Sequence, residues 1–271
     1  MMKRVPVSVI IPSFNSQDTI ERAVKSVANQ TLLPLEVIII DDHSTLKENY
    51  TTLKYIEDQY SPYFKLKVIK NKENQGPGVS RNNGWDISDG DYVTFLDADD
   101  AWHKKKIEIQ YNYMKRNPTV DFTCHENLIS NSKDPIEVNG LISEYKVDFN
   151  SLLIKNDIGT RTVMLKRSIA NRFAKGKYHS EDYLLWMEIA SDGYSIIKLN
   201  IPLSYSFSHP YLGDGLSGNL FKMFKGELNS FYQLLKEKKL GKFKYALVTF
   251  FSTLKFIKRI LFSVGYRTLR R

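Results

Sequence analysis

The sequence predicts an α/β fold in which a mostly parallel sheet is flanked by helices and followed by a basic helical extension. Three observations predict this fold. Apolar, β-branched runs alternate with helical patterns through residues 1–118. Acidic or polar residues directly follow three of these runs. Basic residues are concentrated after residue 235.

Four short apolar runs have the pattern of strands buried on both faces of a parallel sheet. They occupy residues 7–11, 37–40, 66–69 and 92–96. Ligands of such sheets bind beyond the carboxyl ends of the strands. We therefore expect the polar residues that follow the first, second and fourth runs to share one crevice.

Helical spacing of apolar residues appears between these runs. The first helix is predicted from Ile20, Ala23, Val24, Val27 and Ala28. Asp18 and Glu21 are expected to form a capping box at its start. Two further helices are predicted over 79–87, after the break at Gly76-Pro77, and over 104–116.

The second half of the chain has a weaker pattern. Residues 126–155 predict loops and short strands, 183–191 a helix, and 203–207 a strand. The glycines of 211–218 indicate a flexible loop. The expected organisation is one domain over 1–220, with a nucleotide-binding half at 1–118 and an acceptor half at 119–220. A helical, basic amphipathic extension is expected over 221–271.

Composition excludes several classes of protein. The 271 residues are 42% hydrophobic, which is too apolar for a disordered chain. Cys124 is the only cysteine, so neither an intramolecular disulfide nor a cysteine-based metal site is possible. No apolar stretch reaches the roughly 18–20 residues that span a bilayer, and no targeting segment is visible. We expect a cytoplasmic chain, peripheral on the inner face of the membrane.

The net charge of +9 is unevenly distributed. Residues 236–271 contain eleven Lys and Arg and one acid, and so carry +10, which leaves −1 for residues 1–235. A nucleic-acid-binding protein would present a basic stripe on its folded body. The neutral body therefore argues against nucleic acid as a partner.

Two acidic segments follow predicted strands. Asp97-Ala98-Asp99-Asp100 offers hard oxygen ligands suited to Mg²⁺ or Mn²⁺, which commonly bridge one or two carboxylates to a diphosphate. Asp41-Asp42-His43-Ser44 offers carboxylates that can accept hydrogen bonds from a base or a ribose. The alternative for each segment is a solvated turn.

Two further segments carry candidate chemistry. Residues 74–84 form a glycine-bearing loop that opens a helix and can offer N–H groups and a cation, Arg81, to phosphates. Neither GxGxxG nor GxxxxGK[ST] is present. An acid within 179–183 is a candidate general base, or a favourable charge at a helix N-terminus. The histidines lack metal-ligand spacing, and His209 alone is kept as a candidate ligand.

Four segments in this order resemble family 2 glycosyltransferases of the GT-A fold, which build bacterial surface polysaccharides. The first two are the opening strand at 7–15 and the second strand with its end at 30–44. The third joins Asn74-x-Gly76 and Ser80-Arg81-Asn82-x-Gly84 to the DxD motif, Asp97-Ala98-Asp99. The fourth is the "ED" segment, Ser180-Glu181-Asp182-Tyr183-x-x-Trp186. The resemblance spans about residues 5–210.

The resemblance implies a role for each matching residue. Asp182 would be the general base, and Glu181 would help to position the acceptor. Asp99 and Asp97, with His209, would hold Mn²⁺ or Mg²⁺, and Trp186 and Trp102 would contact the acceptor. Asp42 would read the nucleotide base. The other residues expected at the donor are Pro12, Ser13, Phe14, Asn15, Gly76, Arg81, Asp97 and Ala98.

The chain departs from the family pattern at three places. Leu46 stands where another Asp is frequent, and His43 where a small residue is frequent. The segment after His209 is also longer than usual. These departures concern the contacts to the donor base and the loop over the site.

The C-terminal extension predicts a basic amphipathic helix. Lys244, Lys255, Lys258 and Arg259 fall within about 100° on a helical wheel, and a broad apolar face lies elsewhere. Such a helix, over 242–271, can lie in an anionic membrane interface. The alternative is a helix packed on the body or on a second subunit.

Taken together, the sequence predicts an inverting, metal-dependent glycosyltransferase. It would move a sugar from a nucleotide-diphospho-sugar, expected to be UDP-linked, to a glycan or lipid-linked acceptor in surface-polysaccharide synthesis. Two alternatives stay open. One is a catalytically silent glycan-binding or scaffold subunit of an assembly complex. The other is a different nucleotide-sugar enzyme on the same sheet.

Overall fold

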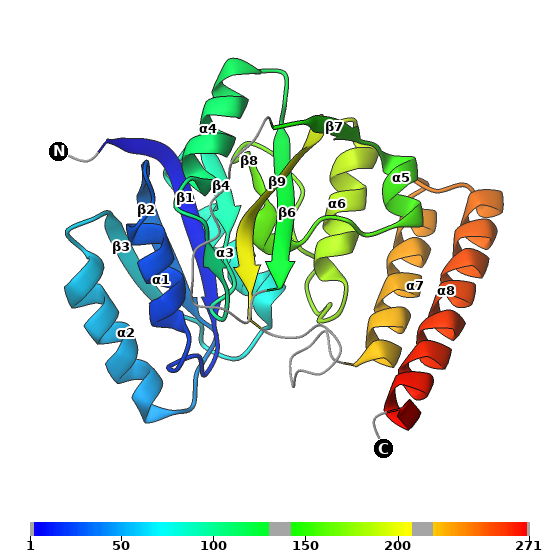
Figure 1. Ribbon diagram of the computed structural model, residues 1–271, viewed down its shortest axis with the longest axis horizontal. Helices are drawn as coiled ribbons and strands as arrows, with labels where there is room; N and C mark the ends of the chain where they lie inside the picture. The colour runs from blue at the N-terminus through cyan, green and yellow to red at the C-terminus, as the bar shows by residue number, and fades with distance from the viewer. Residues whose placement is uncertain (1–2, 130–141, 208–218, 270–271) are drawn as a thin grey trace.

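Within the residues that the structure describes, one sheet of nine strands runs through the molecule (Figure 1). The computed structural model describes residues 3–129, 142–207 and 219–269, with side chains through 260. Eight strands form a continuous order, and the ninth, β7, pairs with β9. The order is β3 (Lys65–Lys70), β2 (Leu33–Asp41), β1 (Arg4–Ser13), β4 (Tyr92–Phe95), β8 (Met164–Lys166), β6 (Phe122–Ile129), β9 (Ile196–Ser206) and β5 (Ala101–Trp102), and β7 is Glu144–Val147.

The first four strands are parallel, as the sequence predicts. β1 lies between β2 and β4, and β3 lies outside β2. Their carboxyl ends therefore meet at one edge, where Ser13 pairs with Asp41. β8 joins this parallel part to β6 by antiparallel pairing on both of its sides. The nucleotide-binding half and the acceptor half that we expected thus share one sheet.

Helices cover the sheet and form the C-terminal extension. Those of the body are α1 (Ile20–Ala28), α2 (Lys47–Tyr60), α3 (Pro77–Asp86), α4 (Lys106–Arg116), α5 (Phe149–Ile154) and α6 (Glu181–Ser191), with a 3₁₀ turn, η1 (Thr160–Thr162). The extension consists of α7 (Leu220–Lys236) and α8 (Lys242–Leu269). No helix in the described part of the chain combines the length and apolar character that a membrane span requires.

Several expectations about local structure need correction. The capping box at α1 is wrong, because Thr19 is the N-cap and no side chain caps the helix. β9 begins at Ile196, seven residues before the strand that we expected at 203. The sequence did not predict α2, whose apolar face is only Leu53 and Ile56, or β6, whose pairing is long-range. The glycine-containing loop at 211–218 lies outside the described residues.

The extension packs on the body through α7. Phe231 and Leu234 of α7 are buried in the core cluster that also contains Trp186. α8 packs outside α7, where Phe256 stacks on Phe224 with 4.1 Å between ring centroids. Figure 1 shows α7 and α8 side by side at the edge of the molecule opposite α2. The basic face that we expected on α8 is divided. Lys244 donates to Asn150 and Lys255 donates to the Ile154 carbonyl, so both of these lysines contact α5.

Candidate active site

The site lies where the carboxyl ends of β1, β2 and β4 meet. The Asp42 N–H donates to the Ser13 carbonyl at 2.7 Å, so the segments that follow β1 and β2 are joined directly. Asp97 follows β4 by two residues. The strand pairing therefore confirms that these strand ends meet at one edge of the sheet.

Asp42 holds the loop that leads into α3. Its carboxylate accepts from the N–H groups of Gln75 at 3.0 Å and Gly76 at 2.7 Å, and from Asn71 Nδ2 at 2.8 Å. The side chain is buried, with 3% of its surface exposed. Bonds from two backbone N–H groups fix a loop strongly, because the acceptor is charged. Asp42 thus shapes the loop, whatever it contacts on a donor.

Gly76 allows this loop to adopt its turn. Its φ is +85°, in the region that favours glycine, and it is the N-cap of α3. A Cβ built there would lie 2.7 Å from Cε1 of Tyr178. Pro77 at the first turn agrees with the preference of helix starts for proline. The segment before α6 therefore lies directly against the loop at the start of α3.

The segment after β1 combines an exposed aromatic ring with a fixed polar anchor. Phe14 is 49% exposed, whereas Pro12 and Ser13 are buried. Asn15 Oδ1 accepts from the N–H groups of Thr45 at 3.0 Å and Leu46 at 3.3 Å. Asn15 adopts φ +47°, one of the unusual positive values that cluster at ligand sites. Of these expected donor residues, Phe14 presents the most side-chain surface.

Arg81 links the two halves of the site. Its Nη2 lies 2.6 Å from Asp97 Oδ1, and its Nη1 lies 3.1 Å from Glu181 Oε1. The guanidinium is buried, with 6% of the side chain exposed. Burial acts to raise the pKa of Asp97, but the charges of Arg81 and Arg161 outweigh it and the pKa is lowered. Arg81 therefore keeps Asp97 ionised and aligns it with Glu181.

The remaining polar residues of α3 hold it in place. Asn82 exchanges two hydrogen bonds with the Phe173 backbone, at 2.8 and 3.0 Å. Ser80 accepts from Asn71 at 3.0 Å. Gly84 lets the helix lie close to β1, since a Cβ there would lie 2.6 Å from Ile10 Cγ2. The motif of residues 80–84 thus fixes the position of Arg81.

Arg161 of η1 covers the acidic segment. Its Nε lies 2.6 Å from Asp100 Oδ2, and its Nη2 lies 3.5 Å from Asp97 Oδ2. Asp100 is buried, and burial, together with the neighbouring acids, raises its pKa to about 8 against the opposing effect of Arg161. Arg22 of α1 donates to the Asp99 carbonyl at 2.6 Å. Neither arginine was predicted from the sequence to lie at the site.

The acidic segment fits a divalent ion that keeps few protein ligands. Asp99 is exposed, Asp97 is partly exposed, and both supply carboxylate oxygens of the kind that Mg²⁺ and Mn²⁺ prefer. Among the described residues, no group of three or more His, Cys, Asp or Glu is placed to hold a metal. His209 lies outside the described residues. Asp99 therefore offers the more open carboxylate of the segment, since both oxygens of Asp97 already lie near arginine nitrogens.

The start of α6 carries two adjacent acids. Ser180 precedes them in the left-handed conformation, with φ +56°, and its hydroxyl donates to the Met223 carbonyl of α7. Asp182 Oδ2 accepts from Thr160 Oγ1 at 3.1 Å, and its Oδ1 accepts from the Tyr183 N–H at 2.7 Å. Thr160 was not identified from the sequence, because a single hydroxyl before a short strand carries no distinctive pattern.

Both acids have raised pKa values. Burial and the charge of Asp182 raise the pKa of Glu181 to about 7, although Arg81 opposes the shift. Burial raises the pKa of Asp182, and Arg81, the Tyr183 N–H and Thr160 oppose that shift. A carboxylate whose pKa approaches neutral pH is suited to accept and release a proton.

The two tryptophans expected at the acceptor are buried, and these expectations are corrected. Trp186 has no exposed surface and packs edge-on against Phe122, with 5.0 Å between ring centroids. Trp102 is 4% exposed, and its Nε1 donates to the Arg161 carbonyl at 2.9 Å. Trp186 is a core residue. Trp102 supports η1, which carries Thr160 and Arg161.

Comparison with known proteins identifies the family. Residues 8–173 match the model of glycosyl transferase family 2, which covers more than half of the chain. The chain belongs to this family. It is 30% identical over 222 residues to the Escherichia coli UDP-Glc:alpha-D-GlcNAc-diphosphoundecaprenol beta-1,3-glucosyltransferase WfgD, covering 81% of this chain and 82% of the relative.

Solved structures show the same fold as this glycosyltransferase. Staphylococcus aureus TarS 1–349 in complex with UDP-GlcNAc has a TM-score of 0.68 at 20% identity, over 92% of this chain and 70% of that one. The Pyrobaculum calidifontis mannosyltransferase PcManGT, in complex with GDP-Man and Mn²⁺, has a TM-score of 0.65 at 17% identity, over 92% and 69%. The GT-A fold expected from the sequence is confirmed, and the glycosyltransferase carries its acidic residues at the predicted strand ends.

Proposed function

We propose that the chain transfers a sugar from a UDP-sugar to a hydroxyl of a lipid-linked glycan, with inversion at the anomeric carbon. The observation that carries the proposal is the position of Asp182. Its carboxylate lies at the start of α6, next to Glu181, which Arg81 connects to Asp97. The candidate base is thus the residue next to Glu181, and Arg81 links Glu181 to the acidic segment after β4.

The chemistry assigned to Asp182 is general-base catalysis. Asp182 takes the proton of the acceptor hydroxyl as that oxygen forms a bond to the anomeric carbon. The bond between this carbon and the diphosphate oxygen breaks, and UDP leaves with the bonding electron pair. Attack opposite the leaving group inverts the configuration. The Thr160 hydroxyl and the Tyr183 N–H hold the carboxylate for this step.

Donor binding is assigned to the ends of β1, β2 and β4. The exposed ring of Phe14 supplies an apolar surface, and Asp42 fixes the loop at Gly76. Asp42 remains the residue proposed to read the base, because it directly follows β2 and its N–H joins this strand end to Ser13. Asp97 and Ala98 lie at the end of β4, where the diphosphate would pass.

Asp99 and Asp97 would hold a divalent ion, which would neutralise charge that develops on the leaving diphosphate. Two relationships support this assignment. Asp99 is exposed beside the strand end, and a solved structure of the same fold contains GDP-Man and Mn²⁺. The UDP preference is supported by the names of WfgD and the TarS complex, and the lipid-linked acceptor by the name of WfgD.

A nucleotide panel tests the donor assignment. Thermal unfolding is measured with UDP, GDP, CDP and dTDP, each with and without Mn²⁺. Binding to the folded state alone stabilises it by about 2.7 kcal/mol at a hundredfold excess over Kd. We expect UDP to raise the unfolding temperature most, and Mn²⁺ to increase that shift in the wild type but not in Asp99→Asn. No shift with any nucleotide would contradict the proposal.

A further inference from the structure

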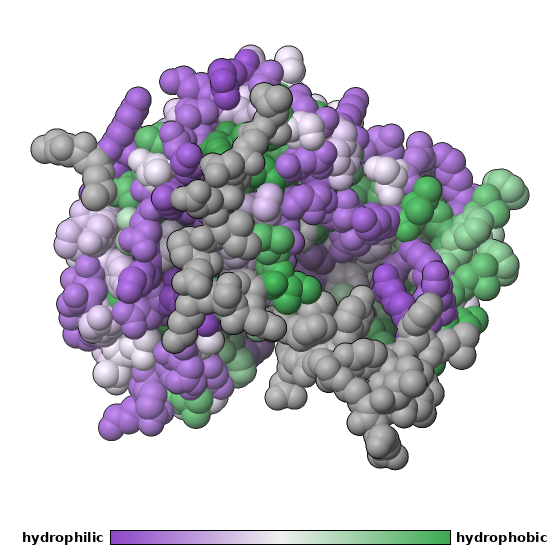
Figure 2. All heavy atoms as spheres, viewed as in Figure 1, coloured by the Kyte–Doolittle hydropathy of each residue, from purple (hydrophilic) through white to green (hydrophobic). Residues whose placement is uncertain are grey.

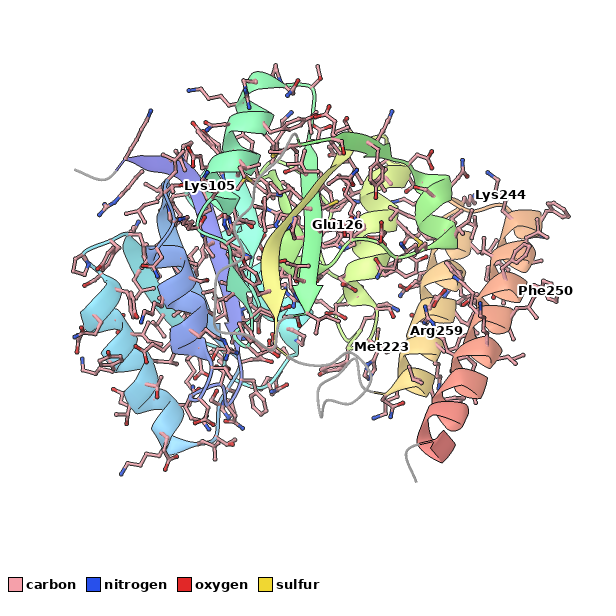
Figure 3. All side chains as sticks on the ribbon, in the orientation of Figure 1. Lys105, Glu126, Met223, Lys244, Phe250 and Arg259 are labelled. Carbon is pink, nitrogen blue, oxygen red and sulfur yellow. The ribbon has the colours of Figure 1, made fainter. Side chains whose placement is uncertain are left out.

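The outward face of α8 carries a continuous apolar stripe. Its members recur at intervals of four and three residues, so they lie along one side of the helix. Between 40% and 78% of the surface of each is exposed. They are Phe243, Leu247, Phe250, Leu254 and Ile257. Figure 2 shows hydrophobic side chains gathered at the edge of the molecule formed by α8, and Figure 3 shows Phe250 pointing away from the body.

The stripe is not needed to attach α8 to the body. The opposite face makes those contacts: Ser252 donates to Glu227 at 2.8 Å, and Phe256 stacks on Phe224. Tyr245 and Val248 pack against the core. Because the inner face accounts for the packing of α8, the outer stripe needs another explanation. Exposed apolar surface of this extent commonly marks an interaction site.

The positive charge of α8 indicates which kind of partner would bind the stripe. The helix contains six Lys and Arg and no acidic residue. Exposed Lys242 precedes Phe243, and exposed Lys258 lies one turn beyond Leu254, so basic side chains border the stripe. A stripe with this spacing also suits pairing with a second helix. However, two copies of α8 would bring together twelve positive charges and no negative ones, which opposes self-association.

We propose that α8 lies in the headgroup region of an anionic lipid bilayer, with the stripe directed toward the acyl chains. Apolar side chains bordered by Lys are the features that hold a helix in such an interface. This proposal rests on the proposed function, because a lipid-linked acceptor is held at a bilayer and the enzyme must reach it there. The binding itself depends only on α8.

The position of α7 connects this surface with the site. α7 lies between α8 and the start of α6, where the Met223 carbonyl accepts from Ser180 at 3.3 Å. Lys177 also donates to the Gly226 carbonyl of α7 at 2.8 Å. Figure 3 shows Met223 on α7 beside the start of α6 and Phe250 on the outer side of α8. A bilayer against α8 would therefore lie on the side of the molecule where α7 contacts Ser180, the residue before Glu181 and Asp182.

Vesicle flotation of the full chain tests the proposal. The probes are phosphatidylcholine vesicles and vesicles that also contain phosphatidylglycerol. We expect binding to the second kind and its loss at high salt, because the attraction is partly electrostatic. Phe250→Glu should reduce this binding by about tenfold or more, because it places a charge in the stripe. The matched control is Tyr50→Glu, which makes the same charge change at a 72% exposed aromatic on α2 and should change nothing.

Results of two kinds, in flotation or in sedimentation, would overturn the proposal. One is equal flotation with both kinds of vesicle, or equal flotation of Phe250→Glu and wild type. The other is a dimer in sedimentation that Phe250→Glu dissociates, without vesicle binding, which would assign the stripe to a second copy. The UDP-dependent thermal shift of all three proteins is measured in parallel. Vesicle binding without a UDP shift would reject the proposed function alone, whereas a UDP shift without vesicle binding would reject only the membrane proposal.

Discussion

Arg81 and Glu181, one hundred residues apart in the chain, form a buried ion pair with 3.1 Å between Nη1 and Oε1. The other Arg81 nitrogen contacts Asp97 at 2.6 Å. One guanidinium therefore fixes the distance between the acidic segment after β4 and the start of α6. The resemblance assigns Arg81 to the donor, and its two ion pairs also hold Asp97 and Glu181 in place.

Replacing Arg81 by Met should destabilise the chain and reduce transfer. Glu181 would lose its ion pair and Asp97 the closer of its two arginines, and breaking a buried ion pair typically costs about 3–5 kcal/mol. Chemical denaturation measures the loss. Arg81→Lys should restore little, because a single ammonium does not reproduce the two-sided contact of a guanidinium. Lys65→Met, which breaks the exposed pair with Asp89 at 2.9 Å, is the control and should barely change the unfolding midpoint.

The stability of the chain should depend on the protonation of Glu181. Its pKa is raised from 4.5 to about 7 on folding, so its contribution to stability is fully present below pH 4.5 and is lost as pH rises through 7. Glu181→Gln should remove that part of the pH dependence. Glu188, on the same helix, also has a pKa raised to about 7, chiefly by burial. Glu188→Gln should therefore flatten the stability profile similarly.

The same two variants should differ in their activity profiles. Transfer requires ionised Asp182, whose pKa is raised, so the rate should fall on the acid side. Glu181→Gln removes a neighbouring negative charge and should move this acid limb to lower pH. Glu188→Gln should leave the limb in place. An identical limb for Glu181→Gln and wild type would show that Glu181 does not influence the base.

Gly76→Ala should cost more stability than Gly193→Ala. Both glycines have positive φ, of +85° and +88°, and alanine is strained by about 1–2 kcal/mol in such a conformation. A Cβ at Gly193 meets no atom within 4 Å, whereas a Cβ at Gly76 meets the Tyr178 ring. Thermal unfolding should rank the variants in that order, and only Gly76→Ala should weaken the UDP-dependent shift. Equal effects would mean that Tyr178 moves aside freely.

Thr160→Val should slow transfer without weakening UDP binding. The variant removes the hydroxyl that donates to Asp182 at 3.1 Å, which lets the carboxylate turn and raises its pKa further. We expect kcat to fall about tenfold and the acid limb to move to higher pH. Thr162→Val is the control, because Thr162 donates to the Gly159 carbonyl in the same turn. It should alter stability but not the pH profile.

The sequence predicts the parallel half of the fold well, because its signals are local. The apolar runs of β1 and β2 and the polar residues after them lie where expected. His43 shows where prediction from sequence stops. The family resemblance indicates that a small residue is frequent at this position, and the φ of +62° in the structure explains that preference. Left-handed backbone at such a turn cannot be deduced from composition alone.

The rest of the fold and of the site depends on contacts between residues far apart in the chain. Thr160 and Arg161 lie at the site because Trp102 donates a hydrogen bond to the Arg161 carbonyl. No pattern in the sequence predicts that contact. Trp186 was misassigned because its place in the "ED" segment suggested exposure, whereas it lies on the core side of α6. Sequence spacing could predict which acids gather at the site. Which arginines neutralise them depends on how the two halves of the chain pack.

The central claim is tested most directly by Asp182→Asn. Sugar transfer from UDP-Glc and UDP-GlcNAc to a GlcNAc-diphospho-lipid is measured beside the UDP-dependent thermal shift. Asparagine keeps the shape of the side chain but cannot take the acceptor proton. We predict a loss of transfer of about 10²–10⁴-fold with an unchanged UDP shift. Transfer within a fewfold of wild type would contradict the assignment of Asp182 as the base and, with it, the proposed mechanism.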